Sequence, residues 1–365
     1  MKNKVFPQKI ALGSSFCNRV RERQLLLELL SEVRPTLITS PRRYGKTSLG
    51  IFVLEQQAWP YAHIDFFPAV SHEDVTNLIL GAIGEIVAKL ESTQQKALKL
   101  VSTFFSDLNV SFRFINTHVD IDFNRDNSAN SKTLSNALVK LDLMLTKKKK
   151  QAVIFLDEFQ RLSQIKGSEV IEGAIRFVAQ KSKALGFLFS GSNRHMLSKM
   201  FDDSARPLYK LCDRIVLDRI SADDYRRFIN TQAKKLWNSA LDDETIDLLL
   251  ELTECHAYYV NVLCSRLWRQ ENIIVNNDVL AAWKDYAIEE KSAVSKELDG
   301  LSQNQFKYLV ALARAGGTET PLAESFLLEA ILPLSSSRQA LNVLTEKDYV
   351  MHKEKIGRAS CRERV

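Results

Sequence analysis

The sequence predicts an α/β protein built on a parallel β-sheet, and three short segments carry this prediction. Residues 36–39 form an apolar, strand-like run that enters a tight loop and then an amphipathic stretch over 48–55. Residues 151–156 form a second apolar run, which ends in two carboxylates. Residues 185–189 form a third, which changes abruptly to small polar residues. Apolar runs of this length that stop at polar residues are typical of buried parallel strands.

The loop after the first run carries the pattern Gly-Lys-Thr. It follows a strand and opens a helix, which is the context that a P-loop requires. Backbone N–H groups of such a loop surround phosphate oxygens, and the helix N-terminus adds positive potential. We expect Lys46 to reach the β- and γ-phosphates of ATP and Thr47 to give its hydroxyl to Mg²⁺. The residues expected to form the binding loop are Ser40, Pro41, Arg42, Arg43, Tyr44, Gly45, Lys46, Thr47 and Ser48.

Ser40 departs from the full phosphate-binding pattern, which has glycine at this position. Serine is also small, and Pro41 can set the backbone of the turn that follows it. The departure therefore weakens the motif only slightly.

The second apolar run ends in Asp157 and Glu158. We expect Asp157 to hold Mg²⁺ through water and Glu158 to act as the general base on the attacking water. A strand that simply runs into a solvated loop would look the same. The upstream phosphate-binding loop makes the catalytic interpretation much the stronger of the two.

The third apolar run ends in Ser190-Gly-Ser192-Asn193. P-loop enzymes with an extra strand between their two nucleotide motifs carry a polar sensor residue at this place. Ser192 or Asn193 would then touch the γ-phosphate or the attacking water. The alternative is an ordinary strand-to-helix turn in which Ser192 caps the next helix.

Hydrophobic patterning predicts further elements of the core. Pro35 ends the first helix, Pro68 stops a strand, and Ser71 begins a long helix. Residues 109–123 alternate between apolar and polar side chains, which predicts either a hairpin or a single exposed strand. Helices are expected over 19–32, 71–90 and 131–146, and core strands over 61–67 and 213–217.

Composition excludes several classes of protein. The chain has 365 residues, enough for two or three domains. No apolar run approaches membrane-spanning length, and residues 1–17 lack the apolar centre of a signal peptide. The five cysteines have no C-x-x-C spacing, and the six histidines give no zinc signature. We expect a cytoplasmic protein that contacts no membrane.

Residues 355–365 resemble the translation of a sequencing-library adapter, so we expect this tail to be non-native and the natural chain to continue differently. The tail holds four basic residues and one acid, a net charge of +3. Without it, the net charge falls from +6 to +3, close to neutral for a chain of this size. The overall charge therefore gives little support to nucleic-acid binding.

These motifs together resemble the archaeal-type ATPases of the STAND branch, which are related to AAA-type and origin-recognition ATPases. The resemblance covers roughly residues 10–350 and is strongest over 16–200. It implies a P-loop ATPase core over 1–218, a helical lid over 219–295 and a winged-helix domain over 296–354. The matching segments are Phe16-x-x-Arg19-x-x-Glu22, Pro41-Arg-Arg-Tyr-Gly-Lys-Thr-Ser-Leu49, Leu156-Asp-Glu-Phe-Gln160 and Ser190-Gly-Ser192.

Two positions depart from the family pattern. The family's lid motif Gly-x-Pro, which lines the adenine pocket, is replaced here by Cys255-His256-Ala257. The family's usual arginine is replaced by Leu211. Arg206 is our candidate for the charge that senses hydrolysis, with Lys210 as a substitute. The alternative is that Arg206 is a surface residue paired with Asp202 or Asp203.

The winged-helix prediction includes helices over 303–315 and 321–330 and a third ending near Leu344, followed by a wing strand from 349. The third helix would present Arg338, Gln339 and Asn342, which are residue types that read bases. Few basic residues surround them, so a packing or regulatory role is favoured over DNA contact.

We predict an ATP-binding protein that hydrolyses ATP to ADP and phosphate as a conformational switch. Its catalytic residues would be Lys46, Glu158, Ser192 and Arg206, and Thr47 and Asp157 would bind Mg²⁺. Turnover is expected to be slow until a protein partner, or a second copy of the chain, supplies a further group. One alternative is a nucleotide-regulated DNA-binding factor that acts through the winged helix. Another is a scaffold that binds nucleotide without hydrolysing it.

Overall fold

The computed structural model describes residues 5–108, 110–115, 118–123, 131–347, 349–355 and 358–363. Between 110 and 123, and after 350, it describes the backbone alone. The chain divides into two compact units, Met1–Asn276 and Asn277–Val365. The domain boundaries predicted near 218 and 295 stay predictions.

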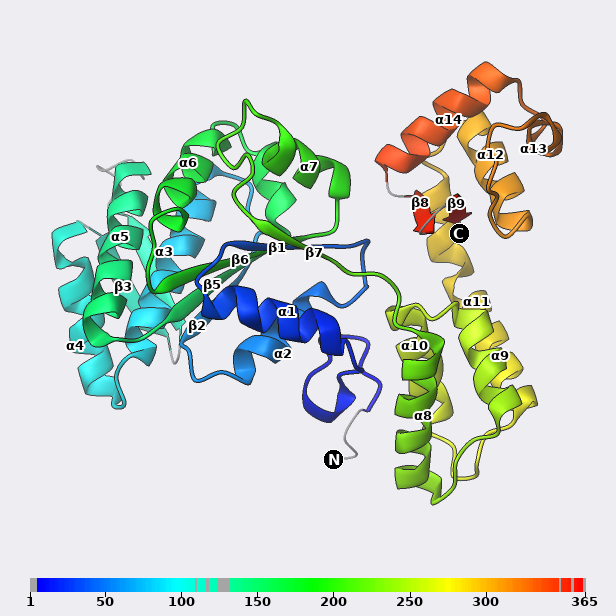
Figure 1. The fold of residues 1–365 in the computed structure, drawn as a ribbon, viewed down its shortest axis with the longest axis horizontal. Coiled ribbons are helices and arrows are strands. Elements are labelled where there is room, and N and C mark those ends of the chain that lie inside the picture. The colour runs from blue at the N-terminus through cyan, green and yellow to red at the C-terminus, as the bar shows by residue number, and fades with distance from the viewer. Residues whose placement is uncertain are drawn as a thin grey trace. The chain divides into compact units, whose positions relative to one another are not determined.

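The first unit is built on a parallel sheet of five strands in the order β2-β5-β6-β1-β7 (Figure 1). Strand β6 lies between β1, which precedes the phosphate-binding loop, and β5, which ends in Asp157. The predicted α/β class and the additional strand are therefore confirmed. The strands are β1 (Thr36–Thr39), β2 (Tyr61–Asp65), β5 (Ala152–Asp157), β6 (Leu185–Gly191) and β7 (Asp213–Val216).

Helices cover both faces of this sheet, because its central strands are apolar on both sides. Every residue of β1, β5 and β6 is buried. Helices α1 and α2 pack on one face, and α3 to α7 pack on the other (Figure 1). The helices are α1 (Val20–Ser31), α2 (Lys46–Glu55), α3 (His72–Lys89), α4 (Gln94–Phe105), α5 (Ser131–Lys148), α6 (Ser168–Ala179) and α7 (Arg194–Asp202).

Strands β3 (Val110–Ile115) and β4 (His118–Phe123) pair antiparallel, which is the hairpin of the two predicted alternatives. Their side chains lie outside the described part of the structure. Helix α4 was not predicted from the sequence. Short 3₁₀ helices occur at η1 (Gly13–Ser15), η2 (Ser106–Leu108) and η3 (Phe159–Gln164).

The rest of the first unit is helical. Helices α8 (Ala222–Trp237), α9 (Asp243–Thr253) and α10 (Ala257–Leu267) follow β7. Each begins at a polar residue whose side chain accepts a backbone N–H, which satisfies a donor that the helix itself cannot. Helix α11 (Asn276–Leu298), predicted as part of the lid, begins at the division and belongs to the second unit.

The second unit continues with three helices that share a small apolar core of their own. The helices are α12 (Gln303–Arg314), α13 (Glu324–Ala330) and α14 (Leu334–Glu346). Strand β8 (Val350–Lys355) pairs antiparallel with β9 (Arg358–Glu363), so the backbone of the tail forms a strand. The winged-helix assignment stays a prediction. No helix in the described residues is long and apolar enough to cross a bilayer.

Candidate active site

The predicted phosphate-binding loop connects β1 to α2 and needs glycine at one point. Gly45 immediately precedes α2 and has φ +92°, in the left-handed region that favours glycine. The first N–H groups of α2 have no partner within the helix, so this end attracts anions. Ser40, where the motif has glycine, is fully buried. The serine is therefore accommodated inside the loop.

The ammonium group of Lys46 is held inside the loop. Its side chain is only 5% exposed. Nζ donates to the carbonyl oxygens of Ser40, at 3.1 Å, and Pro41, at 3.0 Å. These partners place a positive charge in the curve of the loop, where a phosphate would be received.

Asp157 is the centre of a hydrogen-bond network at the end of β5. Thr47 Oγ1 donates to Asp157 Oδ2 at 2.6 Å, and Ser190 Oγ donates to Oδ1. His63 Nε2, from the neighbouring strand β2, lies 3.3 Å from Oδ2. Burial alone would raise the pKa of Asp157, but hydrogen bonds from His63, Ser190 and Thr47 together hold it below its usual value. The carboxylate is therefore kept ionised.

Thr47 and Asp157 fit the predicted role of binding Mg²⁺. A hydroxyl and an ionised carboxylate are the hard oxygen donors that this ion prefers. Their direct hydrogen bond shows that both oxygens reach the same point. No group of three His, Cys, Asp or Glu side chains suited to a metal occurs in the described residues, so this pair is the candidate.

Glu158 is bound by two side chains from different elements. Ser192 Oγ, just after β6, donates to Glu158 Oε2 at 3.1 Å, and Gln160 Nε2 donates to the same oxygen. Glu158 has φ +50°, a conformation that non-glycine residues rarely adopt. Ser192 thus contacts the predicted base, and Asn193 rather than Ser192 caps α7.

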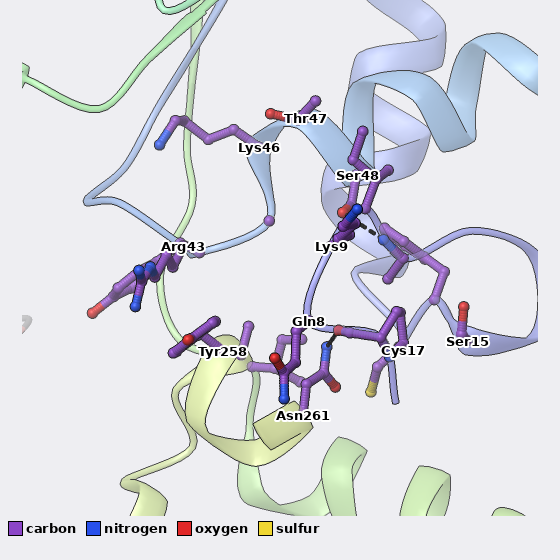
Figure 2. A pocket seen from close by; sticks show the side chains of 18 of the residues that line it. Gln8, Lys9, Ser15, Cys17, Arg43, Lys46, Thr47, Ser48, Tyr258 and Asn261 are labelled. Carbon is purple, nitrogen blue, oxygen red and sulfur yellow. Dashed lines mark hydrogen bonds between the residues drawn. The ribbon is translucent and has the colours of Figure 1, made fainter. Parts of the chain in front are cut away.

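A cavity of about 480 Å³ lies beside the loop, within the first unit. Figure 2 shows Lys46 and Thr47 on one side of it, with Tyr258 and Asn261 of α10 on another. A segment near the N-terminus closes a further side and is tied down at both ends. Asn261 Nδ2 donates to the carbonyl of Pro7 at 2.9 Å, and the N–H of Ala11 donates to Ser48 Oγ at 3.0 Å. Glu158 also lines the cavity.

Arg19 anchors the phosphate-binding loop to the end of the core. Its guanidinium, 6% exposed, donates to the carbonyls of Tyr44, at 3.0 Å, and Asp218, at 2.7 Å. It also pairs with Glu22. The Phe16-x-x-Arg19-x-x-Glu22 segment is therefore hydrogen-bonded to the loop through the buried guanidinium of Arg19.

The lid motif that departs from the family pattern contacts the loop through aromatic rings. His256 begins α10, where its Nδ1 accepts the N–H of Tyr258 at 3.2 Å. Its ring packs edge-on against Tyr44, with centroids 4.9 Å apart. The Arg43 guanidinium stacks over Tyr258 at 4.0 Å. The start of α10 therefore contacts the loop through His256 and Tyr258.

The structure does not bring every predicted residue to the cavity. Arg43, Tyr44, Gly45, Lys46, Thr47, Ser48 and Glu158 line it, whereas Ser40, Pro41, Arg42, Asp157, Ser192 and Arg206 do not. Arg42 is exposed. Ser40 and Pro41 shape the loop through their carbonyls, and Asp157 and Ser192 act through Thr47 and Glu158.

The predicted partners of Arg206 are wrong. Its guanidinium pairs with Glu169 at 2.7 Å and with the fully buried Glu172, both on α6. Asp202 pairs instead with Arg214. The error arose because sequence proximity suggested Asp202 or Asp203, whereas the fold brings α6 alongside. A catalytic role for Arg206 stays a prediction.

Sequence reasoning missed His63, Gln160, Ser190 and the N-terminal segment as parts of the site. His63 alternates within an ordinary strand pattern, and nothing in its spacing links it to Asp157. Ser190 and Gln160 belong to the segments that resemble the family. Ser190 is two residues before Ser192, and Gln160 is two residues after Glu158. This proximity in sequence could have indicated that they belong to the site.

Comparison with solved structures identifies the fold over almost the whole chain. A Walker-type ATPase of Pyrococcus abyssi superposes with a TM-score of 0.68 at 16% identity, covering 98% of this chain and 97% of that one. The chain has a P-loop ATPase fold. The ORC2 protein of Aeropyrum pernix gives a TM-score of 0.59 at 16% identity, covering 99% of this chain and 93% of that one.

The ORC1 protein of Aeropyrum pernix, solved in complex with DNA, gives 0.51 at 13% identity, covering 98% of this chain and 91% of that one. No protein-family model matches the chain, and no curated protein matches its sequence.

Proposed function

We propose that this protein binds ATP together with Mg²⁺ and hydrolyses ATP to ADP and phosphate. One juxtaposition carries this proposal: Thr47, in the first turn of α2 beside the cavity, donates a hydrogen bond to Asp157, which ends β5. Lys46 precedes Thr47, and Glu158 follows Asp157. A phosphate-binding group, a metal-binding pair and a base are thus assembled from the ends of two strands. The ATPases that share this fold support the same activity.

Each side chain has a defined task in the proposed reaction. Lys46 exchanges loop carbonyls for oxygens of the β- and γ-phosphates. Thr47 and Asp157 hold Mg²⁺, which when bound neutralises phosphate charge. Glu158 accepts a proton from the attacking water. Positioning and charge neutralisation supply most of the rate.

The cavity also suggests how hydrolysis is used. It is lined by the loop and Glu158 on one side and by Tyr225, Ala257, Tyr258 and Asn261 from α8 and α10 on the other. A nucleotide there contacts both the sheet and the helices, so its loss changes how they are held together. We propose that the protein is a conformational switch. Arg206 is bound by two glutamates, which favours a positive charge supplied by a partner or a second copy.

Calorimetry with ATP and Mg²⁺ tests the binding step. Lys46→Ala should lose most of the affinity while its circular dichroism stays that of the parent. Lys166→Ala removes an exposed lysine from the same unit and serves as the matched control. Equal ATP affinity in Lys46→Ala and Lys166→Ala would contradict the assignment of the loop.

A second candidate function is nucleotide-regulated DNA binding through the second unit. Arg338, Gln339 and Asn342 are all exposed on α14, as a base-reading surface requires. Titrating the full chain with duplex DNA at several salt concentrations distinguishes the two. Binding that weakens steeply with salt, and is lost in Arg338→Ala, would favour this candidate.

A further inference from the structure

The side chains around Glu158 form a closed triangle of hydrogen bonds. Gln160 Nε2 donates to Glu158 Oε2 and lies 3.4 Å from Ser192 Oγ. Ser192 Oγ donates to the same carboxylate oxygen at 3.1 Å. Both donors act on Oε2, and no side chain that the structure describes donates to Oε1, so its lone pairs can accept from an attacking water.

The triangle fixes a residue whose backbone is unfavourable. Glu158 has φ +50° and precedes η3, in a conformation that costs on the order of 1 kcal/mol or more. Gln160 is 4% exposed and Ser192 is 2% exposed, so neither donor exchanges freely with solvent. The carboxylate is thus held by rigid groups from the ends of two adjacent strands.

Gln160 lowers stability through its side-chain oxygen, so packing alone does not explain why a glutamine is present at this position. Its Oε1 is buried and accepts no hydrogen bond from the residues that the structure describes. An unsatisfied buried acceptor costs about 1–3 kcal/mol, which an apolar side chain of the same length would avoid. Gly191 also leaves the room that this amide occupies, because a Cβ at 191 would collide with Oε1. The useful group of Gln160 is therefore its Nε2, which binds Glu158.

We propose that Gln160 is a positioning residue that, together with Ser192, orients the carboxylate of Glu158 toward the attacking water. The inference rests on the proposed ATP hydrolysis, and it adds to that function a residue that does not line the cavity. Removing the donor leaves Glu158 in place but free to adopt other orientations. Turnover should then fall while nucleotide binding is retained.

Steady-state ATP hydrolysis by Gln160→Met tests this role, because methionine keeps the length and removes the donor. We expect kcat to fall roughly tenfold, as for other residues that orient a functional group, with KM within about twofold of the parent. Gln160→Leu, which also lacks a donor and adds no charge, should behave likewise if methionine disturbs folding. Gln164→Met, the same change at an exposed position of η3, is the control and should match the parent.

The same substitution in Glu158→Gln separates positioning from packing. If Gln160 acts through the carboxylate, Gln160→Met should lower the residual rate of Glu158→Gln no further. An equal fall in both backgrounds, or a kcat for Gln160→Met equal to that of Gln164→Met, would overturn the inference and leave ATP hydrolysis standing. A parent chain that does not turn over ATP would overturn the proposed function and this inference with it.

Discussion

Glu158 and Glu172 are both carboxylates held by side chains from another element, but only one of them faces a cavity. Glu158 accepts from Ser192 and Gln160 and lines the space beside the phosphate-binding loop. Glu172 is fully buried, and its partner is the guanidinium of Arg206. The two carboxylates are therefore held in similar ways but in different surroundings. Around Glu158 we propose that the hydrogen bonds orient a catalytic carboxylate, whereas around Glu172 the ion pair joins α6 to the loop after α7.

The residues predicted from the P-loop motifs lie together in the structure, whereas the contacts of Arg206, predicted by analogy, differ from those expected. The motif residues Lys46, Thr47, Asp157 and Glu158 come together because parallel strands place their carboxyl ends at one edge. The prediction for Arg206 rests on related proteins, which carry an arginine in this region. Its partners depend on the packing of α6, which no local pattern in the sequence reveals.

The first prediction concerns Thr47 and Asp157, the pair that we propose binds Mg²⁺. Asp157→Asn keeps the size of the side chain but removes its charge, so Mg²⁺ should bind poorly. Mg²⁺-dependent ATP turnover should fall by about a hundredfold, the upper end of the range for losing a group that supports a metal site. A titration of turnover against Mg²⁺ measures this. Turnover equal to the parent at every Mg²⁺ concentration would remove Asp157 from the site.

The second prediction concerns the buried pair. Arg206→Ala leaves the Glu172 carboxylate without its cation and should lower the free energy of unfolding by about 2 kcal/mol. This is below the full cost of breaking a buried pair, because Arg206 is 21% exposed. Urea unfolding measures it. Arg214→Ala, which breaks the exposed pair with Asp202, should cost under about 1 kcal/mol.

The effect of Arg206→Ala should depend on pH in a definite direction. Burial raises the pKa of Glu172, although Arg206 opposes that shift. A carboxyl with a raised pKa in the folded state favours folding at low pH and disfavours it as pH rises through that pKa. Without Arg206 the main offset to the effect of burial is lost, so the pKa of Glu172 rises further in the folded state. Arg206→Ala should therefore lower the free energy of unfolding more at neutral pH than at acid pH. An equal loss at both would show that Glu172 is not the cause.

The third prediction concerns the contact between the loop and α10. Tyr258→Leu removes the ring that stacks with Arg43 and lines the cavity. We expect ATP affinity to fall by roughly two- to fivefold, since an exposed cation–π contact contributes about 0.5–1 kcal/mol. Calorimetry measures the change, with Tyr209→Leu, away from the cavity, as the control. If the two variants bind ATP equally well, α10 does not contribute to binding.

Much of the fold could be predicted because apolar runs and their polar ends are local signals. The positions and the parallel direction of the five core strands followed from them, whereas the place of the additional strand followed from the P-loop motifs. The contact of Ser192 with Glu158 was also within reach, since each residue directly follows one of two adjacent strands. His63 was not, because its link to Asp157 depends on the pairing of β2 with β5. Gln160 was quoted in a motif, but only the turn at Glu158 brings its amide to the carboxylate.

The most direct test of the account is ATP turnover by Glu158→Gln beside the parent chain. Glutamine keeps the size of the side chain and spares Asp157, so ATP binding should be retained. Loss of a general base should lower kcat by at least about a hundredfold. That result, with ATP affinity by calorimetry equal to the parent's, would support Glu158 as the general base of ATP hydrolysis. A variant that hydrolyses ATP at the parent rate would contradict it.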